Sequence, residues 1–185
     1  MKNRYQVQVI TNLDQLNDGE RVALIDHVAR ILKAGFTGTE AEDALAPHIC
    51  HFFVSLLGQY QGARLHIVAH DLEPVGYCFT DQGKAGEQLI TNIQFIAVDP
   101  AHQHTRAARM LVDSAMEQPP LYGLARPKAV KFWKKRGFTV LADQDETGHY
   151  PMGHGLEAKP EFDLYQTFVA PGPTLDNIKQ KLKEI

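Results

Sequence analysis

The sequence predicts a single domain of the α/β class, built on one mixed sheet. The chain has 185 residues, which is close to the usual size of one domain and enough to bury a core. Hydrophobic residues make up 44% and charged residues 22%, as in ordinary globular proteins. The apolar patterns follow the order β-α-α-β-β-β-α-β-α-β-β, whereas a doubly wound sheet would alternate more strictly.

The first elements are a strand and two helices. Residues 5–10 alternate polar and apolar side chains, as a half-buried strand does. Apolar residues recur at helical spacing over residues 16–36, with Gly35 placed as a stop. Residues 39–60 predict a second helix with acidic residues in its first turn, and Pro47 is expected to split it.

Three β-type runs follow. Residues 63–71 and 74–81 are joined by a short segment, which favours an antiparallel hairpin, and His66 and His70 are expected to mark the ends of the first run. Residues 88–99 form the longest and most apolar run. We therefore expect this run to be a central strand.

The second half alternates between helices and strands. A helix is expected over residues 105–117, a short strand over 121–125 and a Pro-initiated helix over 127–138. Residues 139–143 begin a further strand. A long Gly- and His-containing segment at 144–160 then leads into an alternating strand at 161–170 and an amphipathic helix at 174–185.

Composition limits the partners and the compartment. The net charge of -3 gives no general attraction for nucleic acid. Cys50 and Cys78 both lie in apolar runs, which indicates buried free thiols and a reducing compartment. No apolar run approaches the ~20 residues of a membrane span, and the first residues are too polar for a signal peptide. We expect a cytoplasmic protein.

The turn between the central strand and the next helix is a candidate anion site. A helix N-terminus presents unpaired N–H groups and the positive end of the helix dipole, which favour a phosphate. The amides of residues 103–108 could share one concavity, with Arg106 and Arg109 adding charge. Most such turns bind nothing, and no glycine-rich phosphate fingerprint is present. The turn alone therefore favours an ordinary connection.

Two motifs resemble the GNAT acyltransferase superfamily. The segment from Val98 to Leu111 is similar to its acyl-CoA-binding motif, V-x-P-x-x-[RQ]-x-x-G-x-[GA]-x-x-L, and the later AVKFWKKRGF resembles its A-x-x-F-Y-x-x-x-G-F signature. Each motif is moderately specific, but the ordered pair is strong evidence. The resemblance covers about residues 5–169. It implies an acyltransferase domain over residues 1–170, with a mostly antiparallel central sheet flanked by helices. The amphipathic terminal helix, over 171–185, lies outside the resemblance and is expected to pack on the domain or on a partner subunit.

The resemblance also implies a site for coenzyme A. Amides of the turn, residues 103–108, would cradle the pyrophosphate. The strand around residues 95–98 would carry a β-bulge that splays it from its neighbour and leaves a slot for pantetheine. A bulge amide would stabilise the tetrahedral intermediate. No metal is implied. The implied cofactor-binding residues are Phe95, Ile96, Val98, Gln103, His104, Thr105, Arg106, Ala107, Ala108, Arg109, Arg126 and Phe132.

Several positions depart from the family pattern. Arg106 stands where the loop usually has Gly; its side chain could lean outward and bind a phosphate itself, or it could crowd the site. Arg126 stands where an Asn is common and could likewise reach the cofactor. Trp133 replaces the Tyr that commonly acts as general acid, and indole has no useful acidity. Asn92 and Gln94 stand where a Glu or His base is common. They cannot titrate, but as catalytic candidates they could orient a water that relays a proton.

The segment at 144–160 offers other ionisable groups. In the family this region often borders the acceptor site. His149, Tyr150 or His154 could therefore replace the missing acid or base, although a solvated loop with incidental His residues is the simpler interpretation.

Taken together, the residues predict an acyl-CoA-dependent N-acyltransferase. It would transfer acetyl from acetyl-CoA, or another acyl group from its acyl-CoA, to a primary amine by direct attack in a ternary complex. The acceptor would be a small molecule or a peptide amine, without a membrane or nucleic-acid partner. The competing readings are a non-catalytic acyl-CoA-binding sensor and an interaction subunit that has lost the cofactor. Leu175, Ile178 and Leu182 share one helix face, so a homodimer is possible.

Overall fold

The computed structural model describes residues 5–35, 54, 57–58, 62–118 and 120–161. Most of the expected helix at 39–60, with Cys50, lies outside the described residues. So do nearly all of the strand expected at 161–170 and the whole terminal helix with its possible dimer face.

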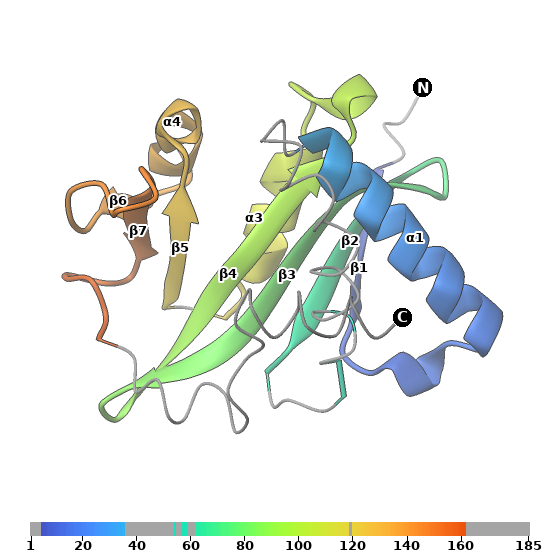
Figure 1. Cartoon of the computed structure of the whole chain (residues 1–185), viewed down its shortest axis with the longest axis horizontal. Helices are drawn as coiled ribbons and strands as arrows, with labels where there is room; N and C mark the ends of the chain where they lie inside the picture. The colour runs from blue at the N-terminus through green and yellow to red at the C-terminus, as the bar shows by residue number, and fades with distance from the viewer. Residues whose placement is uncertain (1–4, 36–53, 55–56, 59–61, 119, 162–185) are drawn as a thin grey trace, which may run out of the picture.

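The described residues form a seven-stranded mixed sheet in the order β1-β2-β3-β4-β5-β7-β6 (Figure 1). All neighbouring strands are antiparallel except β4 and β5, which are parallel. The fold class is therefore as predicted, with the most apolar strand, β4, at the centre. The strands are β1 (Tyr5–Ile10), β2 (Arg64–His70), β3 (Glu73–Ala85), β4 (Gln88–Val98), β5 (Leu121–Ala125), β6 (Thr139–Val140) and β7 (Tyr150–His154).

Helices cover both faces of the sheet. Helix α1 (Asp18–Gly35) lies over one face and α3 (Ala107–Ala115) over the other, so each buries one side of β3 and β4 (Figure 1). Helix α4 (Val130–Lys134) stands at the end of β5. Short 3₁₀ turns complete the order: η1 (Leu13–Gln15), η2 (Pro100–His102) and η3 (Pro127–Ala129).

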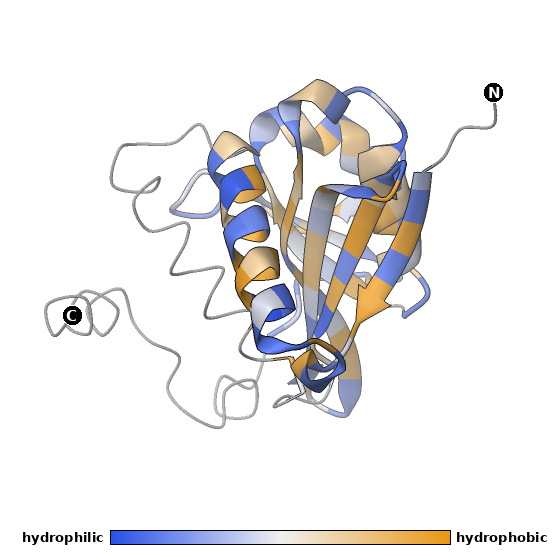
Figure 2. Cartoon of the chain, turned by 90° about the vertical axis from the view of Figure 1, so that its right-hand side faces the viewer, coloured by the Kyte–Doolittle hydropathy of each residue, from blue (hydrophilic) through white to orange (hydrophobic). Residues whose placement is uncertain are grey.

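The spacing of apolar residues along each helix and strand explains why the helices pack on the faces of the sheet. The apolar stripe of α1 turns toward the sheet and its charged stripe away, while β1 alternates in hydropathy along its length (Figure 2). Val28, Ile31 and Leu32 of α1 are all buried in one cluster with residues of β2 and β3. A helical period of 3.6 and a strand period of 2 place these side chains on a common core.

The second core cluster lies on the α3 side. Leu111 and Val112 of α3 are fully buried there, next to Cys78 of β3. Cys78 is a free thiol, as predicted, and burial raises its pKa to about 12.

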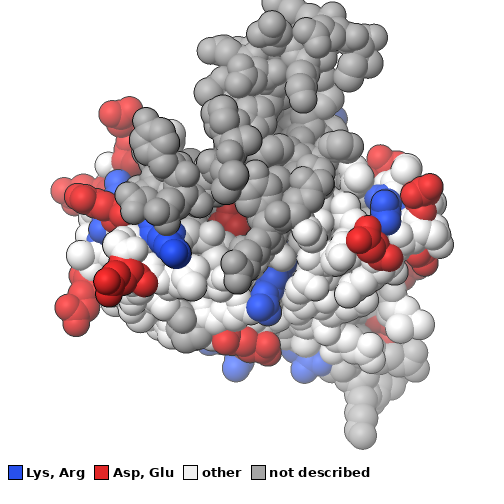
Figure 3. Space-filling view, turned by 90° about the horizontal axis from the view of Figure 1, so that it is seen from below, with Lys and Arg blue, Asp and Glu red and all other residues white. Residues whose placement is uncertain are grey.

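Surface charges are mixed in sign. The face seen from below carries Lys and Arg side chains interspersed with Asp and Glu (Figure 3). No helix in the described ranges is both long and apolar enough to cross a membrane.

The central strand contains a bulge, but not where it was expected. Phe79 of β3 pairs with Phe95, and the next residue, Thr80, pairs with Ile93. Gln94 is therefore the extra residue on β4, one position before the predicted stretch of 95–98. An extra residue bends its strand and increases the local twist.

The segment at 144–160 contains a strand that the sequence did not predict. Strand β7 lies between β5 and β6 and pairs with both. The sequence pattern did not indicate this strand because it contains Pro151 and Gly153, and both residue types are disfavoured in strands. The side chains of Leu141 and Leu156 approach Gly153 closely: a Cβ at this position would lie 2.7 Å from Leu141 Cδ1 and 3.0 Å from Leu156 Cβ, so a larger residue would require both to shift. Strand β6 is correspondingly short and ends at Val140 rather than at residue 143.

His66 lies inside strand β2 and is only 3% exposed, so the prediction that it marks a strand end is wrong. Its Nδ1 is 2.9 Å from Ser114 Oγ of α3, and its Nε2 is 3.2 Å from Thr80 Oγ1 of β3. Burial, and secondarily the charge of Arg64, lower its pKa to about 4. The neutral imidazole thus joins two strands to the helix behind them.

This burial predicts a pH-dependent stability. Between about pH 6.5 and pH 4, the unfolded chain protonates His66 but the folded chain does not, so the free energy of unfolding falls as the pH falls. The contribution is about 3 kcal/mol at its largest. Urea unfolding across this range should show a smaller loss for His66→Gln than for the wild type. Identical pH dependence of the two proteins would contradict the assigned role.

Candidate functional site

Strands β4 and β5 part soon after they meet. They pair only over residues 91–93 and 121–123, and the bulge at Gln94 follows immediately on β4. Figure 1 shows the two strands diverging from a common lower end. The V-shaped opening is therefore built into the backbone.

A cavity of about 460 Å³ fills this opening. It is mixed in character, with apolar side chains on both strands and two cationic side chains, Arg126 and Lys128, on one wall. Its wall comprises Gln94, Phe95 and Ile96 of β4, Leu124 and Ala125 of β5, Arg126, Lys128, Ala129 and Trp133 around α4, and Thr147 and His149 of the segment before β7.

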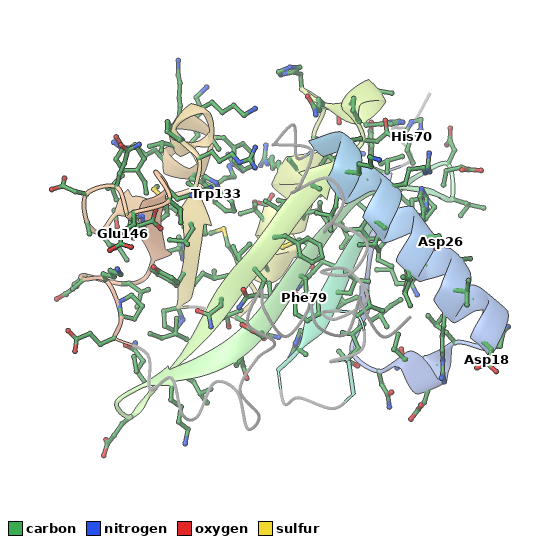
Figure 4. All side chains as sticks on the ribbon, in the orientation of Figure 1. Asp18, Asp26, His70, Phe79, Trp133 and Glu146 are labelled. Carbon is green, nitrogen blue, oxygen red and sulfur yellow. The ribbon has the colours of Figure 1, made fainter. Side chains whose placement is uncertain are left out.

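The structure brings some of the predicted cofactor residues together here. Phe95, Ile96 and Arg126 line the cavity, whereas Phe132 is not part of its described wall. Phe132 instead stacks edge-on against Trp133, with ring centroids 5.5 Å apart. Trp133 itself is 6% exposed and lies between α4 and the sheet (Figure 4). The indole, at the position where the family pattern has a Tyr, thus forms part of the wall.

The turn after β4 is folded by its own hydrogen bonds. The side chain of Asp99 accepts from the Ala101 amide at 2.9 Å and caps η2. The Thr105 hydroxyl donates to the His102 carbonyl at 2.6 Å and accepts from the Ala107 amide at 3.2 Å. These bonds fix the turn between β4 and α3, with Thr105 immediately before Arg106, the N-cap of α3.

The remaining predicted cofactor residues lie in this turn, outside the described wall of the cavity. Val98 ends β4 and is buried. Gln103, His104, Thr105, Arg106 and Arg109 are exposed, Ala107 is buried and Ala108 half-buried. His104 has a φ of 62°, which turns the chain sharply toward α3. The predicted pyrophosphate loop is thus an exposed turn at a helix N-terminus.

The two arginines of this turn point to different partners. The guanidinium of Arg106 lies 5.5 Å from the centre of the Tyr5 ring, which belongs to the outer strand β1 rather than to β5. Arg109 pairs with Asp113 one helical turn away, at 3.2 Å. The Arg106 side chain therefore leans outward from the turn, as in the first of the two alternatives, and its binding of a phosphate stays a prediction.

The two catalytic candidates of β4 differ in exposure. Asn92 is 7% exposed, whereas Gln94 is exposed and lines the cavity. The Gln94 amide donates to Oδ2 of Asp81 on β3 at 2.9 Å, and Asp81 is the register partner of Asn92. Burial raises the pKa of Asp81, and hydrogen bonding to Gln94 and Asn92 lowers it in part.

Sequence reasoning missed Asp81. Asp81 is the last residue of the apolar, strand-like run PVGYCFTD. A carboxylate at the end of such a run is more simply interpreted as a turn residue. Only the pairing of β3 with β4 puts it beside the two candidates.

Of the three candidates in the 144–160 segment, His149, Tyr150 and His154, it is His149 that lines the cavity. Its Nδ1 lies 2.7 Å from Thr147 Oγ1. Asp145 holds this turn by accepting from the Thr147 hydroxyl at 2.7 Å and from the amides of His149 and Thr147. These hydrogen bonds, first that of the hydroxyl, lower the pKa of its carboxyl. His154 lies at the far end of β7 against Phe138.

No three His, Cys, Asp or Glu side chains of the described residues are placed to hold a metal ion.

Comparison with known proteins finds similarity in structure alone. No family model and no curated protein matches the sequence. The PaiA N-acetyltransferase from Thermoplasma acidophilum, solved in complex with coenzyme A, is 11% identical with a TM-score of 0.62, over 80% of this chain and 98% of that chain. A GNAT-family acetyltransferase from Streptococcus pneumoniae is 12% identical with a TM-score of 0.59, over 80% and 98%. Ard1 from Thermoplasma volcanium is 14% identical with a TM-score of 0.58, over 82% and 97%. The chain therefore has the GNAT acetyltransferase fold.

The cavity wall predicts a fluorescence signal. Trp133 is the only tryptophan of the chain and lines the cavity. A ligand that enters between β4 and β5 should therefore change the emission of Trp133 in a saturable way. Titration with acetyl-CoA, excited at the red edge to limit absorption by adenine, measures this change. Free N-acetyltryptophanamide is the control for absorption, and Trp133→Phe should remove the signal. Saturable binding by calorimetry without any change in emission would place the ligand elsewhere.

Proposed function

We propose that this protein is an acyl-CoA-dependent N-acyltransferase. It transfers an acetyl group from acetyl-CoA to a primary amine by direct attack within a ternary complex. The observation that carries the proposal is the cavity of about 460 Å³ between the diverging strands β4 and β5. Strand β4, which forms one wall of this cavity, leads through η2 into the exposed turn before α3.

The cavity fits the chemistry of an acyl-pantetheine arm. Its apolar residues suit the alkyl parts of the arm, and backbone groups along β4 suit its amides. Arg126 and Lys128 supply positive charge on one wall, and the α3 N-terminus offers amides for a pyrophosphate. That a protein of the same fold is solved in complex with coenzyme A supports this assignment.

Transfer needs little acid catalysis on the leaving group. A thiol of pKa ~8.5 leaves readily as the thiolate. Holding amine and thioester in one slot supplies proximity, and a bulge amide of β4 aimed at the thioester oxygen stabilises the developing charge. Trp133 cannot donate a proton. His149, on the same cavity wall, is the ionisable residue placed to do so.

The acceptor in this proposal is a small-molecule or peptide amine. The reaction takes place in the cytoplasm, where a buried free thiol such as Cys78 stays reduced. Association of two copies through the terminal helix is compatible with the proposal but is not needed for it.

A second candidate function is a non-catalytic acyl-CoA sensor. Trp133, Asn92 and Gln94 favour it, because they hold uncharged groups where the family pattern has an acid and a base. A sensor would bind acetyl-CoA and release it unchanged.

Calorimetry and turnover together separate these possibilities. We expect saturable binding of both acetyl-CoA and free coenzyme A, and thiol release from acetyl-CoA in the presence of at least one amine of a diverse panel. Binding without amine-dependent thiol release would favour the sensor. Absence of binding to either ligand would overturn both functions.

Charge reversal tests the cationic wall. Lys128→Glu should weaken acetyl-CoA binding about 10- to 100-fold, because a contact to a charged group contributes about 1.5–3 kcal/mol. Lys84→Glu is the matched control: it changes the net charge equally, but at the exposed end of strand β3. Calorimetric dissociation constants measure both. Equal weakening by the two variants would show that only overall charge matters.

A further inference from the structure

Two buried oxygens on β3 and β4 have no hydrogen-bond partner. Asp81 and Asn92 face each other across the two strands, and each is 7% exposed. Oδ1 of Asp81 and Oδ1 of Asn92 are both buried and unpartnered. Such groups are unusual in a folded protein, because a buried acceptor without a donor is destabilising.

The carboxylate also lacks a counter-ion. In the described ranges of the chain, no Lys, Arg or His forms an ion pair with Asp81, and the side chains that act on its pKa are the uncharged Gln94 and Asn92. A buried carboxylate is costly unless a cation and donors compensate it. The pair Asp81 and Asn92 therefore has the character of a site that receives a cationic donor from outside the described chain.

A primary ammonium group matches this requirement. It carries one positive charge and three N–H donors on a compact head. Two acceptor oxygens on adjacent, paired residues can each take one of these donors, and the negative charge of Asp81 balances the positive charge.

The pair lies next to the proposed thioester slot. Gln94 donates to Oδ2 of Asp81 at 2.9 Å and itself lines the cavity between β4 and β5. The Gln94 side chain thus connects the Asp81 carboxylate to the cavity wall. Phe79 (Figure 4) packs in the core cluster on the α1 side of β3. Asp81 lies two residues later on the same strand, so its side chain is on the same face.

We propose that Asp81 and Asn92 form the ammonium-binding part of the acceptor site, and that Asp81 accepts the proton that frees the amine for attack. This assignment rests on the proposed transferase function. The acceptor enters as R–NH₃⁺ and gives one proton to the Asp81 carboxylate. The nitrogen then forms a C–N bond to the acetyl carbon, the C–S bond breaks, and the second proton passes to the coenzyme A thiolate. Asp81 returns its proton to water, which leaves an amide and a free thiol.

Carbon-13 NMR of the wild-type protein tests the binding step. The probe is n-butylammonium, added in the presence of coenzyme A, and the readout is the side-chain carboxyl resonance of Asp81, identified by its absence in Asp81→Asn. We expect a saturable shift with butylammonium and none with butan-1-ol. The resonance of Asp26, exposed on α1, is the internal control. An Asp81 resonance that butylammonium does not move would overturn the assignment.

Kinetics with the best amine of the panel test the proton transfer. Asp81→Asn should lower kcat/KM about 10²–10⁴-fold, as removal of a general base does, with an unchanged dissociation constant for acetyl-CoA. Asn92→Ala should act mainly by raising KM for the amine. Asp26→Asn is the matched control and should have no effect. Full activity of Asp81→Asn would overturn the catalytic role.

The outcomes separate this inference from the proposed function. A wild-type protein that binds no acetyl-CoA overturns the transferase function itself. A wild-type protein that binds acetyl-CoA and acetylates an amine, but whose Asp81 resonance and Asp81→Asn kinetics do not respond, overturns the amine site alone.

Discussion

The candidate site depends on one backbone feature, the separation of β4 from β5. Parallel pairing ends at Ile93 and Gly123, and the bulge at Gln94 bends β4 at that point. The antiparallel pairing of β3 with β4 continues past the bulge to Val98, so the sheet stays intact on one side while it opens on the other. A cavity at this place does not interrupt the hydrophobic core, because helices α1 and α3 pack on the sheet around β3 and β4.

The same bulge links the two halves of the proposed reaction. Gln94, its extra residue, has its side chain against the cavity and its amide on Asp81. Asn92 and Gln94 of β4 are uncharged, but the site still contains a carboxylate, that of Asp81 on the adjacent strand β3. Its burial without a cation destabilises the free protein, and an ammonium ligand would offset that cost. This arrangement reconciles the departures from the family pattern with a catalytic function.

The sequence predicted the mixed sheet, strands β1 to β5 and helix α1. In β1 and α1 the apolar residues repeat at the strand and helix periods, whereas the central strands, buried on both faces, are apolar runs of strand length. It failed at β7, where Pro151 and Gly153 mimic a loop, and at His66, whose partners Ser114 and Thr80 come from other elements. The motifs predicted part of the cavity wall, including Ile96 and Arg126. Asp81 was out of reach, since its significance arises from strand pairing and from an unpartnered oxygen. Neither property is local in sequence.

The central claim is that acetyl-CoA binds between β4 and β5, and methyl NMR tests it most directly. Ile96 and Leu124 line the cavity from opposite strands, whereas Leu72 is 85% exposed at the turn after β2. We expect acetyl-CoA to shift the methyl resonances of Ile96 and Leu124 together, with one saturation curve, and to leave Leu72 unchanged. Saturable binding of acetyl-CoA that moves neither Ile96 nor Leu124 would contradict the account.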